Sequence, residues 1–370
     1  MKYKVPFVDY PKHYHSMQGE IDTAISQVLN GGDFILRAHV RQFEADIASY
    51  VGVDYGVGVN SGTDAMLLSL LAAGIGPGDE VITVAHTFVA TVAVIIHCGA
   101  KPVLVDIGED FNMNVTQLER AITARTRAVI PVHLNGRLCD MEKLMSIASK
   151  RNLCVIEDAA QALGATFDGR KAGSFGLTGC FSFYPAKALG GIGDGGMAVT
   201  NSQGVAEKMR ALRDHCVIRG TGEIVGYGYN SRLDNLQAAV LDVKFKYLPQ
   251  WIERRRELAS MYEAGLTGLP QVKTPPYPQP GRYFDIFTNY VLRAQRRDEL
   301  VAYLIESGIE ILVSWPVPMH RHPALKLGHF PLPETERVSQ EVLSLPLHTE
   351  LSNKQVEYVI DCIRKFYSRK

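Results

Sequence analysis

Three polar residues in the middle of the chain have the types and spacing that covalent chemistry on a cofactor needs. Lys187 stands between an aromatic, strand-like run over residues 181–184 and a glycine-rich loop over residues 190–196, and Asp158 and Gln161 lie upstream. A lysine amine forms an imine with an aldehyde, a carboxylate keeps a pyridine nitrogen protonated, and small residues let backbone N–H groups reach a phosphate. The combination predicts a site for pyridoxal 5'-phosphate (PLP).

Two interpretations are open for each of the two charged residues. Most lysines are solvated at the surface, but an apolar neighbourhood would remove solvation from the ammonium form, lower the pKa of Lys187 and make its amine a nucleophile. Asp158 ends the apolar run 155–158, and ligands bind at the carboxyl ends of strands in open α/β sheets. Asp158 could equally cap the N-terminus of a following helix. Gln161, three residues later, could reach the same ligand.

A second segment has the features of a phosphate site. Residues 60–63 read Asn-Ser-Gly-Thr between an apolar strand pattern and a helical one. A helix N-terminus presents free N–H groups and partial positive charge, Gly62 permits close backbone approach, and Thr63 adds a hydroxyl. Residues 56–62 also approach the G-x-G-x-x-G pattern of a nicotinamide dinucleotide site, but the last interval is one residue too long. An ordinary capped helix without a ligand is the third interpretation.

The bulk composition excludes several classes of protein. The chain of 370 residues has 39 basic and 39 acidic residues and is 46% hydrophobic, so neither nucleic acid nor a membrane surface is an expected partner. The N-terminus lacks the apolar core of a signal peptide, and no run of about 18 apolar residues could span a bilayer. Six scattered cysteines without a C-x-x-C pair indicate reduced thiols and no metal site. We therefore expect a cytoplasmic protein.

Apolar runs alternate with helical patterns between residues 40 and 200. Strands are expected at residues 57–59, 80–84, 101–106, 127–132 and 153–157, and helices at 63–73, 88–98, 114–124 and 141–150. The strand runs are continuously apolar, as expected where helices cover both faces of a sheet. This predicts an α/β fold with a doubly wound, mostly parallel sheet. Phe88 follows one of these strands, where it could stack on a planar cofactor or belong to the core.

The pattern changes after residue 200. A long helix over residues 234–257 and a proline cluster at 275–281 precede further elements of both types, expected as strands at 289–292 and 309–313 and as helices at 297–307 and from 353 onward. Prolines disfavour both helix and central strand. We predict a large α/β domain at residues 1–245 and a smaller C-terminal α+β domain at residues 246–370.

The motifs together resemble the DegT–DnrJ–StrS family of PLP-dependent nucleotide-sugar aminotransferases, which have the fold called type I. The resemblance covers nearly the whole chain, and its motifs occur in family order and at family spacing. They include residues 43–44, 60–65, 78–81, 87–88, 99–100, 132–134, 157–161, 182–185, 187, 193–196, 230–234, 237–239 and 343–346.

The resemblance implies a role for each motif residue. Lys187 would be the Schiff-base lysine and proton shuttle, and Asp158 would pair with the pyridine nitrogen. The remaining cofactor contacts would be Gln161 to the ring hydroxyl, Phe88 stacked on the ring, and Gly62, Thr63 and Ser182 at the phosphate. Asn230 matches a residue that reaches the phosphate from the neighbouring subunit. An obligate homodimer with two shared active sites is therefore implied.

The resemblance also implies the reaction. An amino group would pass from glutamate, which leaves as 2-oxoglutarate, to a keto group of a nucleotide-linked sugar, with carbon 3 favoured, for amino-sugar or cell-surface polysaccharide (lipopolysaccharide O-antigen) biosynthesis. A 4-keto sugar or a cyclitol is the alternative substrate, and a sensor or regulatory protein that keeps the fold is the alternative without catalysis. A dehydrating branch of the family usually has histidine in place of the lysine, so Lys187 argues against it.

Some positions depart from the family pattern. Asn135 and Arg137 stand where Tyr-Gly-Gln is usual, Ser314 and Trp315 replace a His-Tyr pair, and Arg37 replaces a glycine. We expect these positions to face the substrate. The departures leave the identity of the sugar and of its nucleotide open.

Overall fold

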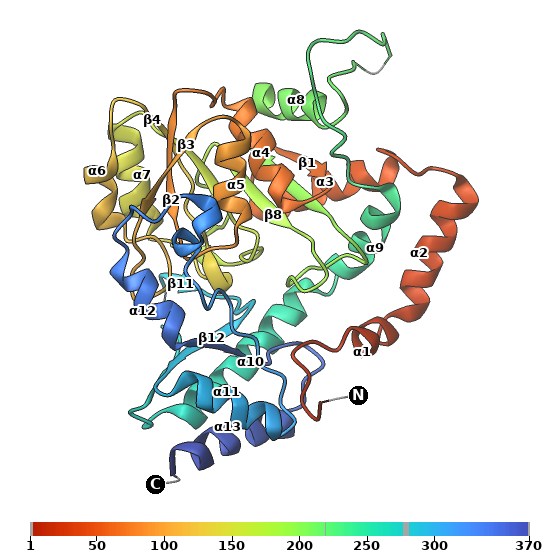
Figure 1. The fold of residues 1–370 in the computed structure, drawn as a ribbon. Coiled ribbons are helices and arrows are strands. Elements are labelled where there is room, and N and C mark those ends of the chain that lie inside the picture. The colour runs from red at the N-terminus through yellow and green to blue at the C-terminus, as the bar shows by residue number, and fades with distance from the viewer. Residues whose placement is uncertain (1–2, 219, 277–280, 369–370) are drawn as a thin grey trace.

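A seven-stranded sheet forms the centre of the molecule (Figure 1). The computed structural model describes residues 3–218, 220–276 and 281–368. The strand order is β1-β9-β8-β5-β4-β2-β3, and β9 runs in the direction opposite to the other six strands. The strands are β1 (Tyr55–Val59), β2 (Glu80–Val84), β3 (Lys101–Val105), β4 (Thr126–Val129), β5 (Cys154–Asp158), β8 (Thr178–Ser182) and β9 (Gly196–Thr200).

Helices cover both faces of this sheet, which is why its strands are apolar throughout. In β2, for example, Ile82 and Val84 belong to one buried cluster and Val81 to another. The helices are α3 (Ala38–Val51), α4 (Gly62–Ala72), α5 (Ala90–His97), α6 (Leu118–Ala121), α7 (Met141–Lys150), α8 (Gln203–Leu212) and α9 (Asn235–Phe245), with short 3-10 turns η1 (Val115–Gln117) and η2 (Leu134–Gly136). This arrangement confirms the predicted α/β fold with a mostly parallel sheet.

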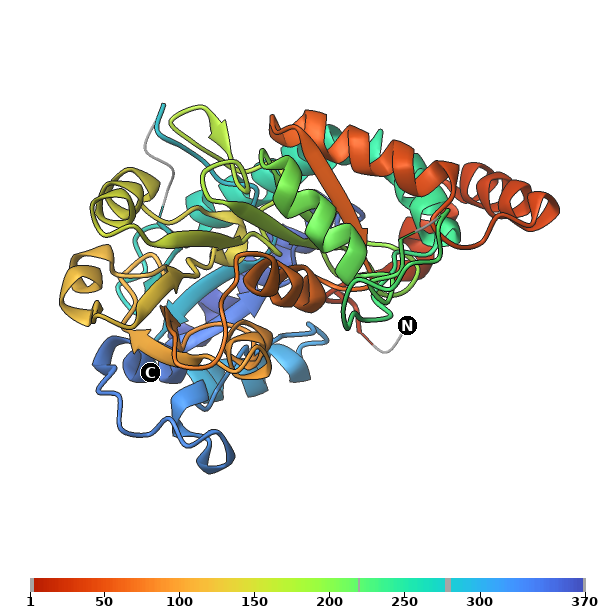
Figure 2. The same ribbon diagram turned by 90° about the horizontal axis from the view of Figure 1, so that it is seen from above.

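The N-terminal helices α1 (Tyr10–His15) and α2 (Gln18–Gly31) lie at one side of the body, and α2 projects from it in both views (Figures 1 and 2). The second helix packs against α9. Its apolar residues Ile21, Ala24 and Val28 are buried and belong to the large cluster of the main domain. The amphipathic spacing of these residues explains why the helix forms there.

A second, antiparallel sheet with the order β10-β12-β13 lies beneath the first in Figure 1. Its own buried cluster includes Tyr262, Tyr290 and Ile363. The elements of this region are β10 (Val272–Lys273), β12 (Tyr290–Ala294), β13 (Val342–Leu345), α10 (Leu248–Leu266), α11 (Arg297–Glu306), α12 (Pro333–Glu341), α13 (Asn353–Ser368), η3 (Met319–Arg321) and η4 (Pro323–Leu325). A domain boundary at residues 245/246 stays a prediction.

A third small sheet, β11-β6-β7, joins distant parts of the sequence. Its strand β11 (Tyr283–Phe284) pairs with β6 (Thr166–Phe167), which pairs with β7 (Arg170–Lys171). Residues 281–284 thereby reach across to the main domain. Among the described residues, no helix has both the length and the apolar character needed to cross a membrane.

Three expectations about single elements were wrong. The helix expected at 234–257 is two helices, α9 and α10, because Pro249 starts a new helix in the first turn of α10. Residues 309–313 form no strand and make only isolated bridges at Ile309 and Leu312. The helix expected at 114–124 ends at residue 121. Of the proline cluster, residues 277–280 lie outside the described part of the chain.

The turn that enters α4 depends on a close approach at Gly196. A Cβ atom added there would lie 2.3 Å from the backbone carbon of Ser61. We expect Gly196→Ala to lower the free energy of unfolding by about 1–3 kcal/mol or more, since neither β9 nor the turn can move freely. Urea denaturation of the cofactor-free protein measures the change.

Gly204→Ala is the matched control, because Gly204 lies in the first turn of α8 with open space around its Cβ position. This variant should be as stable as the wild type or more stable by roughly 0.5 kcal/mol. Equal unfolding midpoints for the two variants would contradict the close approach.

Candidate active site

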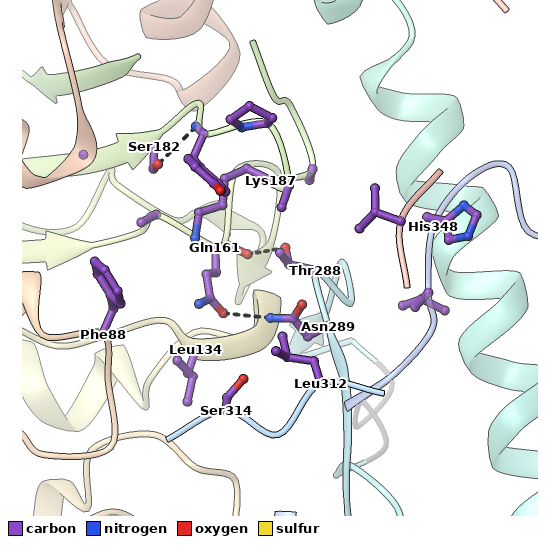
Figure 3. A pocket seen from close by; sticks show the side chains of 18 of the residues that line it. Phe88, Leu134, Gln161, Ser182, Lys187, Thr288, Asn289, Leu312, Ser314 and His348 are labelled. Carbon is purple, nitrogen blue, oxygen red and sulfur yellow. Dashed lines mark hydrogen bonds between the residues drawn. The ribbon is translucent and has the colours of Figure 1, made fainter. Parts of the chain in front are cut away.

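A cavity of about 610 Å³ opens at the carboxyl ends of the parallel strands. Ser61 and Gly62 follow β1, Phe88 follows β2, and Asp158 and Ser182 end β5 and β8. The C-terminal region supplies the opposite wall, from which Thr288, Asn289, Leu312, Ser314 and His348 are drawn in Figure 3. The cavity therefore lies between the main sheet and the C-terminal elements.

Lys187 enters the cavity from the loop between β8 and β9. It is half-buried, and in Figure 3 its side chain lies between Phe88 on one side and His348 on the other. Burial lowers the pKa of the Lys187 amine, and the charge of Asp158 partly opposes this shift. Lys187 is therefore not a solvated surface lysine, and its environment favours the neutral, nucleophilic amine.

Asp158 is 6% exposed and has two defined partners in the main domain. Its Oδ2 accepts a hydrogen bond from Thr91 Oγ1 at 2.7 Å, and its Oδ1 accepts one from the Ala160 N–H at 3.3 Å. Burial raises the pKa of the carboxyl, while Thr91, Ala160, Lys187 and His133 oppose that shift. Turns, and no helix, follow residue 158, so the helix-cap interpretation is wrong. A buried carboxylate of this kind is stabilised by a cationic partner.

The residues predicted for the phosphate converge at the start of α4. Ser61 caps the helix, since its Oγ accepts a hydrogen bond from the Asp64 N–H at 3.1 Å. A Cβ atom added to Gly62 would lie 2.9 Å from Ser182 Cβ, so only glycine lets the two segments meet here. Thr63 lines the same end of the cavity. The arrangement presents helix N–H groups and hydroxyls to an anion.

The structure does not support a nicotinamide dinucleotide site at residues 56–62. Gly56 and Gly58 lie inside β1, and a Cβ atom added to Gly56 would lie 2.4 Å from the Glu44 carbonyl oxygen. Gly56 is therefore needed where β1 packs closely against α3, and it lies inside the strand and not in the turn that would hold a pyrophosphate. The glycines of this strand have a packing explanation.

Phe88 and Gln161 face the cavity (Figure 3). Phe88 is 61% exposed, so the interpretation as a core aromatic is wrong. The Gln161 Oε1 accepts a hydrogen bond from the Asn135 N–H at 2.8 Å, and Asn289 Nδ2 lies 3.5 Å from the same atom. Because its oxygen is committed, the Gln161 amide directs its NH₂ group to other partners, as a donor to a cofactor oxygen must.

The positions that we expected to face the substrate fall into two groups. Ser314 and Trp315 line the cavity. Arg137 does not line it; its Nη1 donates to Asp285 Oδ2 at 2.6 Å and its guanidinium lies 3.8 Å from the centre of the Tyr283 ring. Asn135 also lies outside the lining and holds Gln161. Among the described contacts both residues join parts of the chain, and the expectation that they meet the substrate stays a prediction.

Asn230 does not line the cavity of its own chain. It is exposed and forms an isolated bridge with Asp214, at the end of the segment between α8 and α9 that extends from the body in Figure 1. Arg37 is likewise at the surface, paired with Asp33. The single chain thus leaves Asn230 available to another molecule.

Sequence reasoning missed several cavity residues. Thr91 donates to Asp158, and Thr288 donates from its Oγ1 to the Gln161 carbonyl oxygen at 2.5 Å. His348 is also in the wall. Of these contacts, only the pair of Thr87 and Thr91 could have been found from the sequence. The two threonines are four residues apart at the start of the helix beside Phe88, and residues at this spacing are neighbours on a helix.

These residues fit PLP by their chemistry. The cavity combines an amine of lowered pKa, a buried carboxyl that forms no ion pair with the described residues, and a turn at Gly62 that a Cβ atom would fill. With a sheet whose strands are parallel except for β9, the site defines a PLP-dependent enzyme of fold type I.

The chain belongs to the DegT/DnrJ/EryC1/StrS aminotransferase family, whose model matches residues 15–364. It is a PLP-dependent aminotransferase, as the sequence resemblance predicted.

Similar proteins cover nearly the whole chain. A dTDP-3-amino-3,4,6-trideoxy-alpha-D-glucose transaminase from Streptomyces venezuelae is 42% identical, over 99% of this chain and 97% of the relative. A pleiotropic regulatory protein from Geobacillus stearothermophilus is 44% identical over 98% of each chain. The crystal structure of S. venezuelae DesV in complex with a ketimine intermediate has a TM-score of 0.95 at 42% identity and covers 99% of both chains.

Replacing Asp158 separates two effects of its buried charge, the loss of stability in the cofactor-free protein and the gain in affinity for PLP. Because burial raises its folded-state pKa, the ionised carboxyl destabilises the cofactor-free protein at pH values above the unfolded pKa of about 4. We expect Asp158→Asn to be at least as stable as the wild type without PLP at pH 8, and to bind PLP at least about tenfold more weakly because a charge-assisted bond is lost.

Thermal denaturation with and without added PLP tests both parts of this prediction. The wild type should gain a large increment in unfolding temperature on addition of PLP, and the variant a small one. A variant that unfolds at lower temperature than the wild type without PLP, and gains the same increment with it, would contradict the assignment.

Proposed function

We propose that the enzyme transfers an amino group from glutamate to a keto group at carbon 3 of a nucleotide-linked sugar. The observation that carries the catalytic part is the amine of Lys187 placed beside the buried carboxyl of Asp158 in one cavity. The sugar part is supported by the relative from S. venezuelae, whose name describes a 3-amino dTDP-sugar, and by the matching DesV structure. A 4-keto sugar or a cyclitol is the alternative acceptor.

Each cavity residue has a role in this reaction. Bound PLP supplies an electron sink for the carbanion that forms at the substrate carbon. We assign Gly62, Thr63 and Ser182 to the phosphate, Gln161 to the ring hydroxyl and Phe88 to the ring face. Asp158 would hold the pyridine nitrogen protonated. Lys187, once displaced by the amino substrate, would move the proton between the substrate carbon and C4′ of the cofactor as general acid and base.

A regulatory role without catalysis is the second candidate, because the G. stearothermophilus relative is named a regulatory protein. This chain retains both Lys187 and Asp158, and their environment is the one that catalysis needs: the pKa of the lysine is lowered and the carboxyl is buried. The retained pair favours the enzyme.

The proposed assembly is a homodimer with two shared sites. The segment before Asn230 exposes Ile224 (73%), Val225 (52%) and Tyr227 (101%), an apolar surface that a second copy of the chain would cover. Asn230 would then reach the phosphate end of the partner's cavity. We further propose a C-terminal domain from residue 246 and a role in the cytoplasm in amino-sugar synthesis for cell-surface polysaccharide.

A substrate panel tests the reaction. Purified protein is incubated with PLP, glutamate and either a 3-keto or a 4-keto nucleotide sugar, and the amino product is measured by mass spectrometry. We expect product from the 3-keto sugar and none from Lys187→Ala, because that variant lacks the amine that carries the proton. Full activity of Lys187→Ala would refute the assignment, and product from the 4-keto sugar alone would change the acceptor.

Hybrid dimers test the shared site. We expect Lys187→Ala and Asn230→Asp to be inactive separately, the second because its new carboxylate repels the phosphate. Unfolded together and refolded as a mixture, they should recover about a quarter of wild-type activity, since half of the dimers are hybrids with one intact site. No recovery by the hybrids, which native mass spectrometry detects, would place Asn230 outside the partner's site.

A further inference from the structure

We propose that Thr91 and Thr87 form a hydrogen-bond relay that positions Asp158 and keeps it ionised, which makes Thr91 a positioning residue for the reaction. The inference rests on the role proposed above for Asp158. It assigns a function to two buried hydroxyl groups beside the predicted cofactor contacts.

The contacts of the relay are short and buried. The Thr91 Oγ1 lies 2.7 Å from Asp158 Oδ2 and 2.9 Å from Thr87 Oγ1. Thr91 is fully buried, and Thr87 is 2% exposed. Both residues line the cavity. Thr87 follows β2 and Thr91 lies in the first turn of α5, so the relay links Asp158 at the end of β5 to the neighbouring layer of the fold.

Chemistry fixes the direction of the relay. An ionised carboxylate only accepts hydrogen bonds, so the single proton of the Thr91 hydroxyl must be donated to Asp158. Thr91 Oγ1 then acts as the acceptor toward Thr87, and the Thr87 hydroxyl must be its donor. Hydroxyl groups in such a chain polarise one another, which strengthens the bond that ends on the carboxylate.

The relay offsets part of the free-energy cost of burying the Asp158 carboxylate. Burial raises the pKa of Asp158, and the Thr91 hydroxyl is the first of the groups that oppose this shift, ahead of the Ala160 N–H. Among the described residues, the titratable groups that interact electrostatically with Asp158 are Lys187 from the loop after β8, His133 from the segment after β4 and Cys180 from β8.

The relay also fixes the orientation of the remaining acceptor lone pairs of Asp158. With Oδ2 bound to Thr91 and Oδ1 to the Ala160 N–H, the carboxylate plane is fixed from two sides. A protonated ring nitrogen in the cavity would meet a carboxylate that is already oriented, so little rotational freedom is lost on binding.

The test is the binding of pyridoxamine 5'-phosphate (PMP) to the cofactor-free full chain, measured by isothermal titration calorimetry. PMP carries no aldehyde, so its affinity reports the non-covalent contacts without imine formation at Lys187. We expect Thr91→Val, which removes only the hydroxyl, to weaken PMP binding about 10- to 100-fold. Because Asp158 must be ionised to bind, we also expect the pH at which affinity is half lost on acidification to move upward.

Three variants accompany Thr91→Val. Thr91→Ser restores the hydroxyl and should bind PMP nearly as the wild type does. Thr87→Val removes the outer donor and should weaken binding by a smaller factor, about threefold. Thr83→Val is the matched control: Thr83 is equally buried, but its hydroxyl donates to the Ile130 carbonyl oxygen at 2.9 Å, so PMP affinity should be unchanged.

Three outcomes would overturn the relay. Wild-type PMP affinity and pH profile in Thr91→Val would show that the hydroxyl is a packing feature only, as would equal losses in Thr91→Val and Thr83→Val. The companion variant Asp158→Asn separates failure of the relay from failure of the proposed site. If it binds PMP like the wild type while Thr91→Val is impaired, Asp158 is not the ring partner and the relay cannot act through it.

Discussion

The site depends on two ionisable groups, an amine and a carboxyl, placed in one buried cavity. Lys187 needs a low-dielectric neighbourhood to lose its proton, and Asp158 needs enough hydrogen bonds to keep its charge in the same place. The fold meets both needs by ending β5 and β8 at the cavity floor. Each group moderates the other, since Asp158 opposes the fall in the pKa of Lys187 and Lys187 opposes the rise in the pKa of Asp158. A change in the protonation of either group would therefore change the pKa of the other.

The close contacts around this pair explain the glycines of the neighbouring loops. Gly62 and Gly196 have no space for a Cβ atom, because the turn into α4 packs directly on β8 and β9. Neither has an unusual backbone conformation, so the requirement is one of volume. The end of the cavity beside Gly62 is thereby built from segments that cannot separate without losing packing.

Much of the main domain could be predicted from the sequence, because strands buried on both faces leave continuous apolar runs such as residues 80–84. The cavity residues that end strands, Asp158 and Ser182, could be found for the same reason. Long-range contacts could not: Arg137 meets Asp285 across 148 positions, and nothing near Arg137 in the sequence signals that partner. The break between α9 and α10 depends on Pro249, whose effect a helical pattern alone conceals.

Gln161 connects the two regions of the protein. Its side chain is held by Asn135 from the main domain and approached by Asn289 from the C-terminal region, while Thr288 binds its backbone. A small rotation of the C-terminal elements would therefore change the orientation of an amide that lines the cavity. The placement of the C-terminal elements and the orientation of a polar group in the cavity wall are thus linked through one side chain.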